Sequence, residues 1–321
     1  MVATFIKGRI GNQMFQYAFS KAVKLAQGCE APLVFDFSIV HKMGIPKDGF
    51  EDSLQYFKVE EYKTDTGLIR KYTSCYQKLL FLLYMIDRKF GFIIKKKGSW
   101  FALFRNHGLL YGIRHGYNSQ YFYPVYQKYL KGKKNERIIC NDFFQTPSAF
   151  DHIKPLLIEE FTPKLPPKPE NKSLYDIINS TNSVCVSVRC GDYWSERFRD
   201  KFYVCDKHYF NAAIEKAKEM VQNPVFIFFS DDIGWVKSNL SVDSPSYYQS
   251  EEDPVWERLR LMYSCKHFII SNSTFSWWAQ YLSRNKDNKI VISPDHWLNI
   301  KTDFSSPLIS DEFIKIPCDY H

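Results

Sequence analysis

The chain is 321 residues long, 45% hydrophobic and 24% charged, which is normal for a soluble globular protein and favours two domains over one. Its net charge of +8 favours an anionic ligand or simply a basic surface, but the basic residues are dispersed and form no recognised module, which argues against a nucleic-acid-binding protein. The eight cysteines include no CxxC pair and no zinc spacing, so we expect a reducing, cytoplasmic compartment. Residues 2–6 are too short for a signal peptide, and Leu79–Ile86 is too short to span a bilayer.

The N-terminal segment predicts a strand, a loop, a helix and a second strand. Residues 2–6 form the first strand, and GRIGNQ at 8–13 is the loop. Apolar residues at helical spacing then continue until Gly28 ends the helix, and PLVFDF at 32–37 is the second strand. This order predicts parallel pairing.

The middle of the chain is less informative. Residues 78–92 form a helix-capable apolar run, followed by three lysines at 95–97. Such a helix permits peripheral contact with the inner face of a membrane, although we prefer a core helix with a solvated basic end. Residues 111–130 predict loops and short helices.

A proline-rich run, FTPKLPPKPENKS at 161–173, marks the expected domain boundary. Prolines at this density among charges are incompatible with a regular helix or strand and are typical of a stiff linker. We therefore expect an N-terminal domain over 1–162, a linker over 163–173 and a C-terminal domain over 174–321.

Beyond the linker, short apolar runs alternate with helical patterns, which predicts a doubly wound parallel sheet. The expected strands are 184–188, 225–229, 267–270 and 289–292. The expected helices are one capped by Asp206 and reaching Val221, one at 233–239, one capped by Asp253 with Pro254 at its first position, and one that follows Ser271–Thr274.

Polar residues follow three of these strands, where ligands bind in such sheets. Arg189 can fork onto phosphate oxygens, and the turn at 271–274 offers backbone N–H groups and a helix dipole. The carboxylates of Asp231 and Asp232 can accept hydrogen bonds from a base or a ribose. Together they predict a nucleotide diphosphate site. Each also has a purely structural explanation: an Arg189–Asp192 ion pair, a helix cap at 231–232, and N-capping by Ser273 or Thr274.

Four segments carry a family resemblance: GRIGNQMFQYA (8–18), VSVRCGDY (186–193), FFSDDIGWVK (228–237) and CKHFIISNSTFSWWAQYL (265–282). They resemble the glycosyltransferase family 11 α-1,2-fucosyltransferases. The resemblance implies a GT-B-like α/β fold in which two Rossmann-like domains face a cleft, with the acceptor on the N-terminal domain and the nucleotide-sugar on the C-terminal one. It also implies GDP-fucose as donor, inversion at the anomeric carbon, and no cofactor or metal; Asp231–Asp232 is a weak metal candidate.

The resemblance also assigns roles. Arg189 would neutralise the departing diphosphate, and Asn12 would orient donor and acceptor from the other domain. Our hypothesis for the general base is Glu196, with Asp36 behind it; the alternative for Glu196 is a solvated carboxylate beside Arg197 and Arg199. The expected donor-binding residues are Gly11, Gly191, Asp192, Asp231, Asp232, Glu257, Asn272, Ser273, Thr274 and Phe275.

Three positions depart from the family pattern. Ser187 replaces a histidine, Cys190 replaces a second arginine, and Arg258 stands where an acidic residue is usual. The residue that reads guanine therefore stays open among Glu257, Asp231 and Asp232.

The expected function is transfer of L-fucose from GDP-fucose to the 2-hydroxyl of a galactoside, in an oligosaccharide or a lipid-linked glycan. The alternatives are a transferase for another GDP- or UDP-sugar, and a catalytically silent relative that binds a glycan or a nucleotide.

Overall fold

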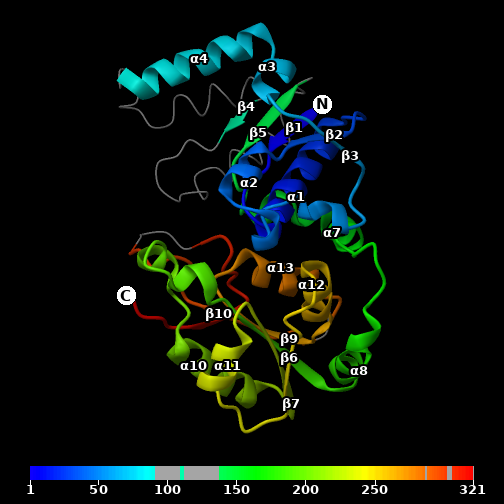
Figure 1. The fold of residues 1–321 in the computed structure, drawn as a ribbon, viewed down its shortest axis with the longest axis vertical. Coiled ribbons are helices and arrows are strands. Elements are labelled where there is room, and N and C mark those ends of the chain that lie inside the picture. The colour runs from blue at the N-terminus through cyan, green and yellow to red at the C-terminus, as the bar shows by residue number, and fades with distance from the viewer. Residues whose placement is uncertain (91–108, 112–136, 286–287, 302–305, 321) are drawn as a thin grey trace. The chain divides into compact units, whose positions relative to one another are not determined.

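The computed structural model describes residues 1–90, 109–111, 137–285, 288–301 and 306–320 (Figure 1). The chain divides into two compact units, an N-terminal unit (Met1–Gln55 and Val59–Glu160) and a C-terminal unit (Tyr56–Lys58 and Phe161–His321). The short piece at 56–58 joins the C-terminal unit because the Lys58 amide donates to Thr162 O (2.9 Å) and the Lys164 amide donates to Tyr56 O (2.9 Å).

The proline-rich run expected as a linker is packed within the C-terminal unit. Pro163 forms a bridge with Phe57, and the Arg260 guanidinium donates to Leu165 O. The backbone N–H of Lys168 donates to the Glu257 carboxylate at 3.0 Å. A 3₁₀ turn, Pro169–Asn171, then leads into helix α8 (Lys172–Ser180). The proline-rich run forms no regular helix or strand before α8, and contacts with side chains of the C-terminal unit fix it in place instead.

The N-terminal unit is built on a five-stranded parallel sheet in the order β3-β2-β1-β5-β4. Helix α1 covers one face, where Ser20 bonds Thr4 of β1 (2.7 Å) and Tyr17 packs on Phe35 of β2. Helix α3 lies against the other face, where Leu68 packs with Ala3 and Ile139. The strands are β1 Val2–Phe5, β2 Leu33–Asp36, β3 Tyr62–Thr64, β4 Leu109–Tyr111 and β5 Ile138–Asn141, and the helices are α1 Ile10–Gln27, α2 Ser38–Met43, α3 Leu68–Tyr72, α4 Cys75–Phe90 and α7 Lys154–Glu160.

The predicted opening of the chain is confirmed. Helix α1 ends at Gly28, whose φ of 60° is the left-handed conformation that glycine adopts without strain. The amide of Gly28 donates to Leu25 O, which closes the last turn. The parallel pairing of β1 with β2 follows the predicted β-loop-α-β order.

Helix α4 differs from the core helix that we preferred. Its apolar side chains at Leu79, Leu82, Leu83, Met85 and Ile86 are 43–56% exposed, so the described part of the helix carries an apolar face that is not buried. None of the described helices is both long and apolar enough to cross a bilayer. Peripheral membrane contact stays a prediction, because the lysines at 95–97 and most of 111–130 lie outside the described residues.

The C-terminal unit holds a six-stranded parallel sheet in the order β11-β10-β9-β6-β7-β8. In chain order from its first strand, this is the 3-2-1-4-5-6 arrangement of dinucleotide-binding sheets. The strands are β6 Asn182–Val188, β7 Pro224–Ser230, β8 Ser246–Tyr248, β9 His267–Ile270, β10 Val291–Pro294 and β11 Ile314–Ile316. The helices are α8 (Lys172–Ser180), α9 Arg199–Phe202, α10 Lys207–Met220, α11 Ile233–Asn239, α12 Val255–Ser264 and α13 Thr274–Leu282.

Helices cover both faces of this sheet (Figure 1). Val184, Val186 and Val188 of β6 pack in one core with Phe210 of α10, and Val236 of α11 belongs to the same core. Helices α8, α12 and α13 lie against the opposite face. As predicted, Asp206 caps α10 by accepting the amide of Tyr209 at 2.9 Å. The expectation of two Rossmann-like domains is therefore confirmed.

Candidate donor site

Three strand ends of the C-terminal sheet lie side by side. The register pairs Val188 of β6 with Ser230 of β7, and Ser187 of β6 with Ile270 of β9. Arg189, Asp231 and Ser271 therefore leave the sheet at the same edge, with neighbouring strands about 4.8 Å apart. The chain order of the strands reverses between β6 and β9, the position at which such sheets bind ligands.

Arg189 is held between two carboxylates. Its Nη1 lies 2.8 Å from Asp231 Oδ2, and its Nη2 donates to Asp192 Oδ1. The guanidinium also lies over the Tyr193 ring, 5.4 Å from its centre. Burial acts to lower the pKa of Arg189, but the charges of Asp231 and Asp192 outweigh it, so the pKa is raised and the group is fully protonated. The ion pair given above as the structural explanation is present.

Gly191 allows this arrangement. Its φ is +30°, and a Cβ at this position would lie 2.2 Å from Asp231 Oδ2. Asp231 also accepts the amide of Cys190 at 2.9 Å, so the carboxylate fastens the loop after β6 to the end of β7. A side chain at 191 would push the carboxylate away from both contacts.

The neighbouring carboxylate has a different task. Asp232 caps α11 by accepting the amide of Trp235 at 2.8 Å, and its own amide donates to Ser230 Oγ at 3.0 Å. Of the two aspartates, the helix cap is thus Asp232, whereas Asp231 faces Arg189. Ser230 O in turn accepts from the side-chain amide of Gln249 at 2.7 Å, a partner that no sequence pattern marks.

A chain of hydroxyls joins β6 to the start of α13. Ser187 Oγ lies 2.6 Å from Ser276 Oγ, which lies 3.0 Å from Ser271 Oγ. All three residues are buried. Ser187 therefore fixes the first turn of α13 against β6. Ser276 was not singled out from the sequence, although its spacing from Ser273 is one helical turn.

The N-terminus of α13 offers backbone donors at the same edge. Among the described residues, no side-chain cap is formed by Ser273, so the predicted N-cap hydrogen bond is absent. The amides of Thr274, Phe275 and Ser276 precede the first intrahelical bond, which joins Trp277 N to Ser273 O at 2.9 Å. Both Thr274 and Phe275 are half-buried. With the helix dipole behind them, these amides suit an anion.

Asn272 ties the turn at 271–274 to two neighbouring segments of the backbone. Its Nδ2 donates to Phe202 O and to Trp297 O, both at 3.0 Å, and the residue is 2% exposed. The side chain is therefore occupied in holding the turn, and a direct contact between this amide and a donor sugar would require breaking those bonds.

Glu257 and Asp253 lie at the start of α12, but their partners differ from those that the sequence suggested. Glu257 is fully buried and bonds Asn171, Tyr175 and Arg260 as well as the Lys168 amide, which leaves it no free edge for a base. Helix α12 is not capped by Asp253; Pro254 is its N-cap. Asp253 Oδ1 instead accepts from Lys168 Nζ and Asn171 Nδ2, both at 3.0 Å.

In the N-terminal unit, Asn12 lies beside the corresponding reversal of strand order, between β1 and β5. Its Oδ1 accepts from Gln145 Nε2 at 2.8 Å, and Gln145 follows the end of β5. Gly8 (φ +73°) allows the approach, because a Cβ there would lie 2.5 Å from Asn12 Nδ2. Gly11 is buried in the first turn of α1. The one sequence signal for Gln145 is its position shortly after the strand β5.

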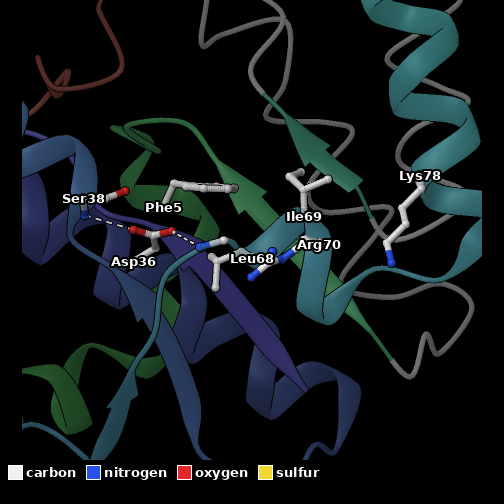
Figure 2. Close-up of a pocket in the computed structure, with 8 residues that line it drawn as sticks. Phe5, Asp36, Ser38, Leu68, Ile69, Arg70 and Lys78 are labelled. Carbon is white, nitrogen blue, oxygen red and sulfur yellow. Dashed lines mark hydrogen bonds between the residues drawn. The ribbon is translucent and has the colours of Figure 1, made fainter.

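A pocket of about 540 Å³ opens in the N-terminal unit at the ends of β1 and β2 (Figure 2). Phe5, Leu68, Arg70 and Lys78 line it together with Asp36. Asp36 is 1% exposed and accepts the amides of Ser38 (2.9 Å) and Gly67 (3.2 Å), as the dashed lines show. This carboxylate thus orders two loops around the pocket.

Glu196 is exposed in the turn after Trp194 and forms no hydrogen bond or ion pair within the described chain. Its role as general base stays a prediction. In the described ranges, no group of three His, Cys, Asp or Glu side chains is arranged to hold a metal ion.

Comparison with known proteins identifies the family. The model of glycosyl transferase family 11 matches residues 139–303, just over half of the chain. The chain belongs to glycosyl transferase family 11. An alpha-1,2-colitosyltransferase of Escherichia coli is 35% identical over 180 residues, 54% of this chain and 60% of the relative. Human galactoside alpha-(1,2)-fucosyltransferase 1 is 32% identical over 104 residues, 31% of this chain and 28% of the relative.

The chain thus matches less than two thirds of the length of each of these relatives. Among solved structures, fucosyltransferase NodZ from Bradyrhizobium gives a TM-score of 0.47 at 12% identity, over 87% of this chain and 92% of that one. ADP-heptose LPS heptosyltransferase II of E. coli gives 0.41 at 11% identity, over 98% and 89%.

Proposed function

We propose that this family 11 protein transfers L-fucose from GDP-fucose to the 2-hydroxyl of a galactoside, with inversion. The observation that carries the proposal is the coincidence of two anion-binding elements at one switch point of the C-terminal sheet. Arg189 follows β6, and the uncapped N-terminus of α13 follows β9, the neighbouring strand. Names of relatives, an alpha-1,2-colitosyltransferase and galactoside alpha-(1,2)-fucosyltransferases, support the linkage and the acceptor class.

The chemistry asks for such a pair. As the bond between the sugar and the diphosphate breaks, negative charge builds on the leaving phosphate oxygens. Donors that are fixed before the reaction stabilise that charge more than the ground state, which lowers the barrier. Arg189 supplies a fixed cation because Asp231 and Asp192 set its orientation, and α13 supplies neutral amides. Both would act on the departing GDP.

A binding experiment tests the donor. Thermal shift over GDP, UDP, CDP and ADP should give stabilisation that is selective for GDP, and Arg189→Ala should abolish it. The matched control is Arg284→Ala, which makes the same change at the other end of α13, about 13 Å away along a helix of nine residues. Indifference of the unsubstituted protein to GDP would overturn the donor assignment.

A transfer experiment tests the reaction. Incubation with GDP-fucose and a galactoside should release GDP and yield an α-1,2 linkage by NMR, and EDTA should leave the rate unchanged. GDP release without acceptor separates an enzyme, which hydrolyses its donor slowly, from a silent binding relative. The similarity to an alpha-1,2-colitosyltransferase favours a second candidate, transfer of a colitosyl group in place of fucose. Competing donors in one reaction would rank the two.

A further inference from the structure

The paired charges at the strand ends that would receive the donor sum to a net negative charge. Arg189 contributes one positive charge, and the two carboxylates bound to it, Asp192 and Asp231, contribute two negative charges, a net of minus one. Cys190 adds no charge, because burial and the nearby Asp231 raise the pKa of its thiol to about 12. An anionic diphosphate would meet unfavourable electrostatics unless another cation stands at this edge.

Arg258, in the first two turns of α12, is held at that edge by backbone carbonyls. Its Nε donates to Asp253 O at 2.8 Å, and its Nη2 donates to Glu251 O at 3.4 Å. The loop that carries these carbonyls follows β8. It is fastened to β7 by Gln249, whose side chain donates to Ser230 O and whose amide donates to Phe228 O at 3.0 Å. The loop that holds Arg258 is therefore fastened to the end of β7, the strand that Asp231 follows.

The electrostatic neighbours of Arg258 agree with this position. It interacts with Asp253, Asp231 and Glu251 as favourable charges and with Arg189 as an unfavourable one. Burial lowers its pKa, yet a guanidinium stays protonated at any physiological pH. Oδ2 of Asp253 is buried and, in the described part of the chain, has no hydrogen-bond partner, which leaves negative potential beside Arg258.

Arg258 also has N–H groups that are available to hydrogen-bond a ligand. A guanidinium has five N–H groups, and two of them are used by the carbonyls of Asp253 and Glu251. Within the described residues no acceptor takes the other three. A half-buried arginine beside a second arginine pays a repulsion that a shared anion would relieve.

We propose that Arg258 is the second cation of the donor-diphosphate site, and that it supplies from α12 the charge that Cys190 does not supply after β6. The proposal rests on the proposed function, since it assumes a nucleoside diphosphate at these strand ends. With Arg258 included, the charges of Arg189, Arg258, Asp192 and Asp231 cancel, and Asp253 is paired with Lys168 at 3.0 Å. The dipole of α13 then favours an anion at this site. Arg258 is thus a binding residue rather than a reader of the base.

Two substitutions distinguish the positive charge of Arg258 from its hydrogen bonds to the loop carbonyls, and so test this assignment. Arg258→Gln keeps a hydrogen-bond donor for the loop carbonyls and removes the charge, whereas Arg258→Lys keeps the charge. Isothermal titration with GDP, GMP and guanosine then locates the contact. We expect Arg258→Gln to lower the affinity for GDP by about 10- to 100-fold, which is the usual loss for a charge-assisted hydrogen bond. The affinity for guanosine should change by less than about 2-fold. Arg258→Lys should recover most of the GDP affinity, and Arg284→Gln is the matched control.

The outcomes are distinguishable. Equal weakening of GDP and guanosine by Arg258→Gln would place Arg258 on the base and overturn the proposal, and so would unchanged GDP affinity. If the unsubstituted protein binds no GDP, the proposed function fails and this inference fails with it. Melting temperatures of the three variants, measured without ligand, separate a loss of binding from a loss of folded protein.

Discussion

Replacement of Glu257 by glutamine distinguishes a structural carboxylate from one that reads a base. The side chain is fully buried, and its Oε1 accepts from the Lys168 amide (3.0 Å), Asn171 (3.1 Å) and Tyr175 (3.2 Å). Glutamine preserves these three bonds through its remaining oxygen. Its amide nitrogen, however, would face Arg260, which now donates to Oε2 at 3.0 Å.

The cost follows from that donor–donor contact. Breaking a buried ion pair by removing one partner costs about 3–5 kcal/mol, and the retained hydrogen bonds reduce this to about 2–3 kcal/mol. For a unit of this size the melting temperature should fall by about 5–10 °C. The control is Glu219→Gln, whose ion pair with Lys216 is solvated (64% exposed on the glutamate side) and should cost less than about 1 kcal/mol.

Urea unfolding followed by tryptophan fluorescence measures the difference, with GDP titration at a temperature at which both variants stay folded. We expect Glu257→Gln to lower the urea midpoint and to leave GDP affinity unchanged. Loss of GDP binding at unaltered stability would show that the carboxylate faces the ligand, and the structural argument would be wrong.

Three further predictions concern the strand ends and the N-terminal unit. Gly191→Ala should displace the Asp231 carboxylate, because the new Cβ would lie 2.2 Å from Oδ2. The affinity for GDP, measured by titration, should fall at least 10-fold. Asp232→Ala should cost about 1 kcal/mol in urea unfolding through the lost cap of α11, with GDP affinity retained. Burial acts to raise the pKa of Glu60, but hydrogen bonds from Lys21 and Lys24 outweigh it, so its folded pKa lies below the ordinary 4.5. Its contribution to stability is therefore complete above about pH 4.5 and is lost as the pH falls through the folded pKa; Glu60→Gln should flatten this acid dependence of the urea midpoint.

Hydrophobic patterning predicts the longer elements well, because a parallel strand covered on both faces is a continuous apolar run and a helix that packs on a sheet carries its apolar residues on one face. The strand at 225–229 and the helix at 233–239 appear as β7 and α11. Short or edge elements were missed. The strands β3, β8 and β11 have three residues each, with no position fully buried, so no hydrophobic pattern marks them.

Side-chain partners distant in sequence were the harder part. The resemblance implies an acidic residue at position 258, which leaves the neighbouring Glu257 as a candidate reader of guanine, yet the partners of Glu257 include Lys168 and Asn171 of the proline-rich run. That run was expected to be a linker, since prolines lack the N–H for a ladder or a helix. The Glu257 carboxylate instead accepts hydrogen bonds from the Lys168 amide and the Asn171 side chain of this run. Local propensity cannot predict such contacts between residues far apart in the sequence.

The grouping of Arg189, Asp231 and Ser271 is predictable from the sequence, because the carboxyl ends of neighbouring parallel strands lie together whichever side chains they contact. For Arg189 the sequence posed a choice between an ion pair and a ligand contact, and the geometry removes the conflict. A guanidinium has five N–H groups, so the contacts to Asp231 and Asp192 orient it and leave other donors for a phosphate. The same carboxylates cancel its charge, however. Orientation of the first arginine thus creates the need for a second cation, which is the role we propose for Arg258, held by the carbonyls of Asp253 and Glu251.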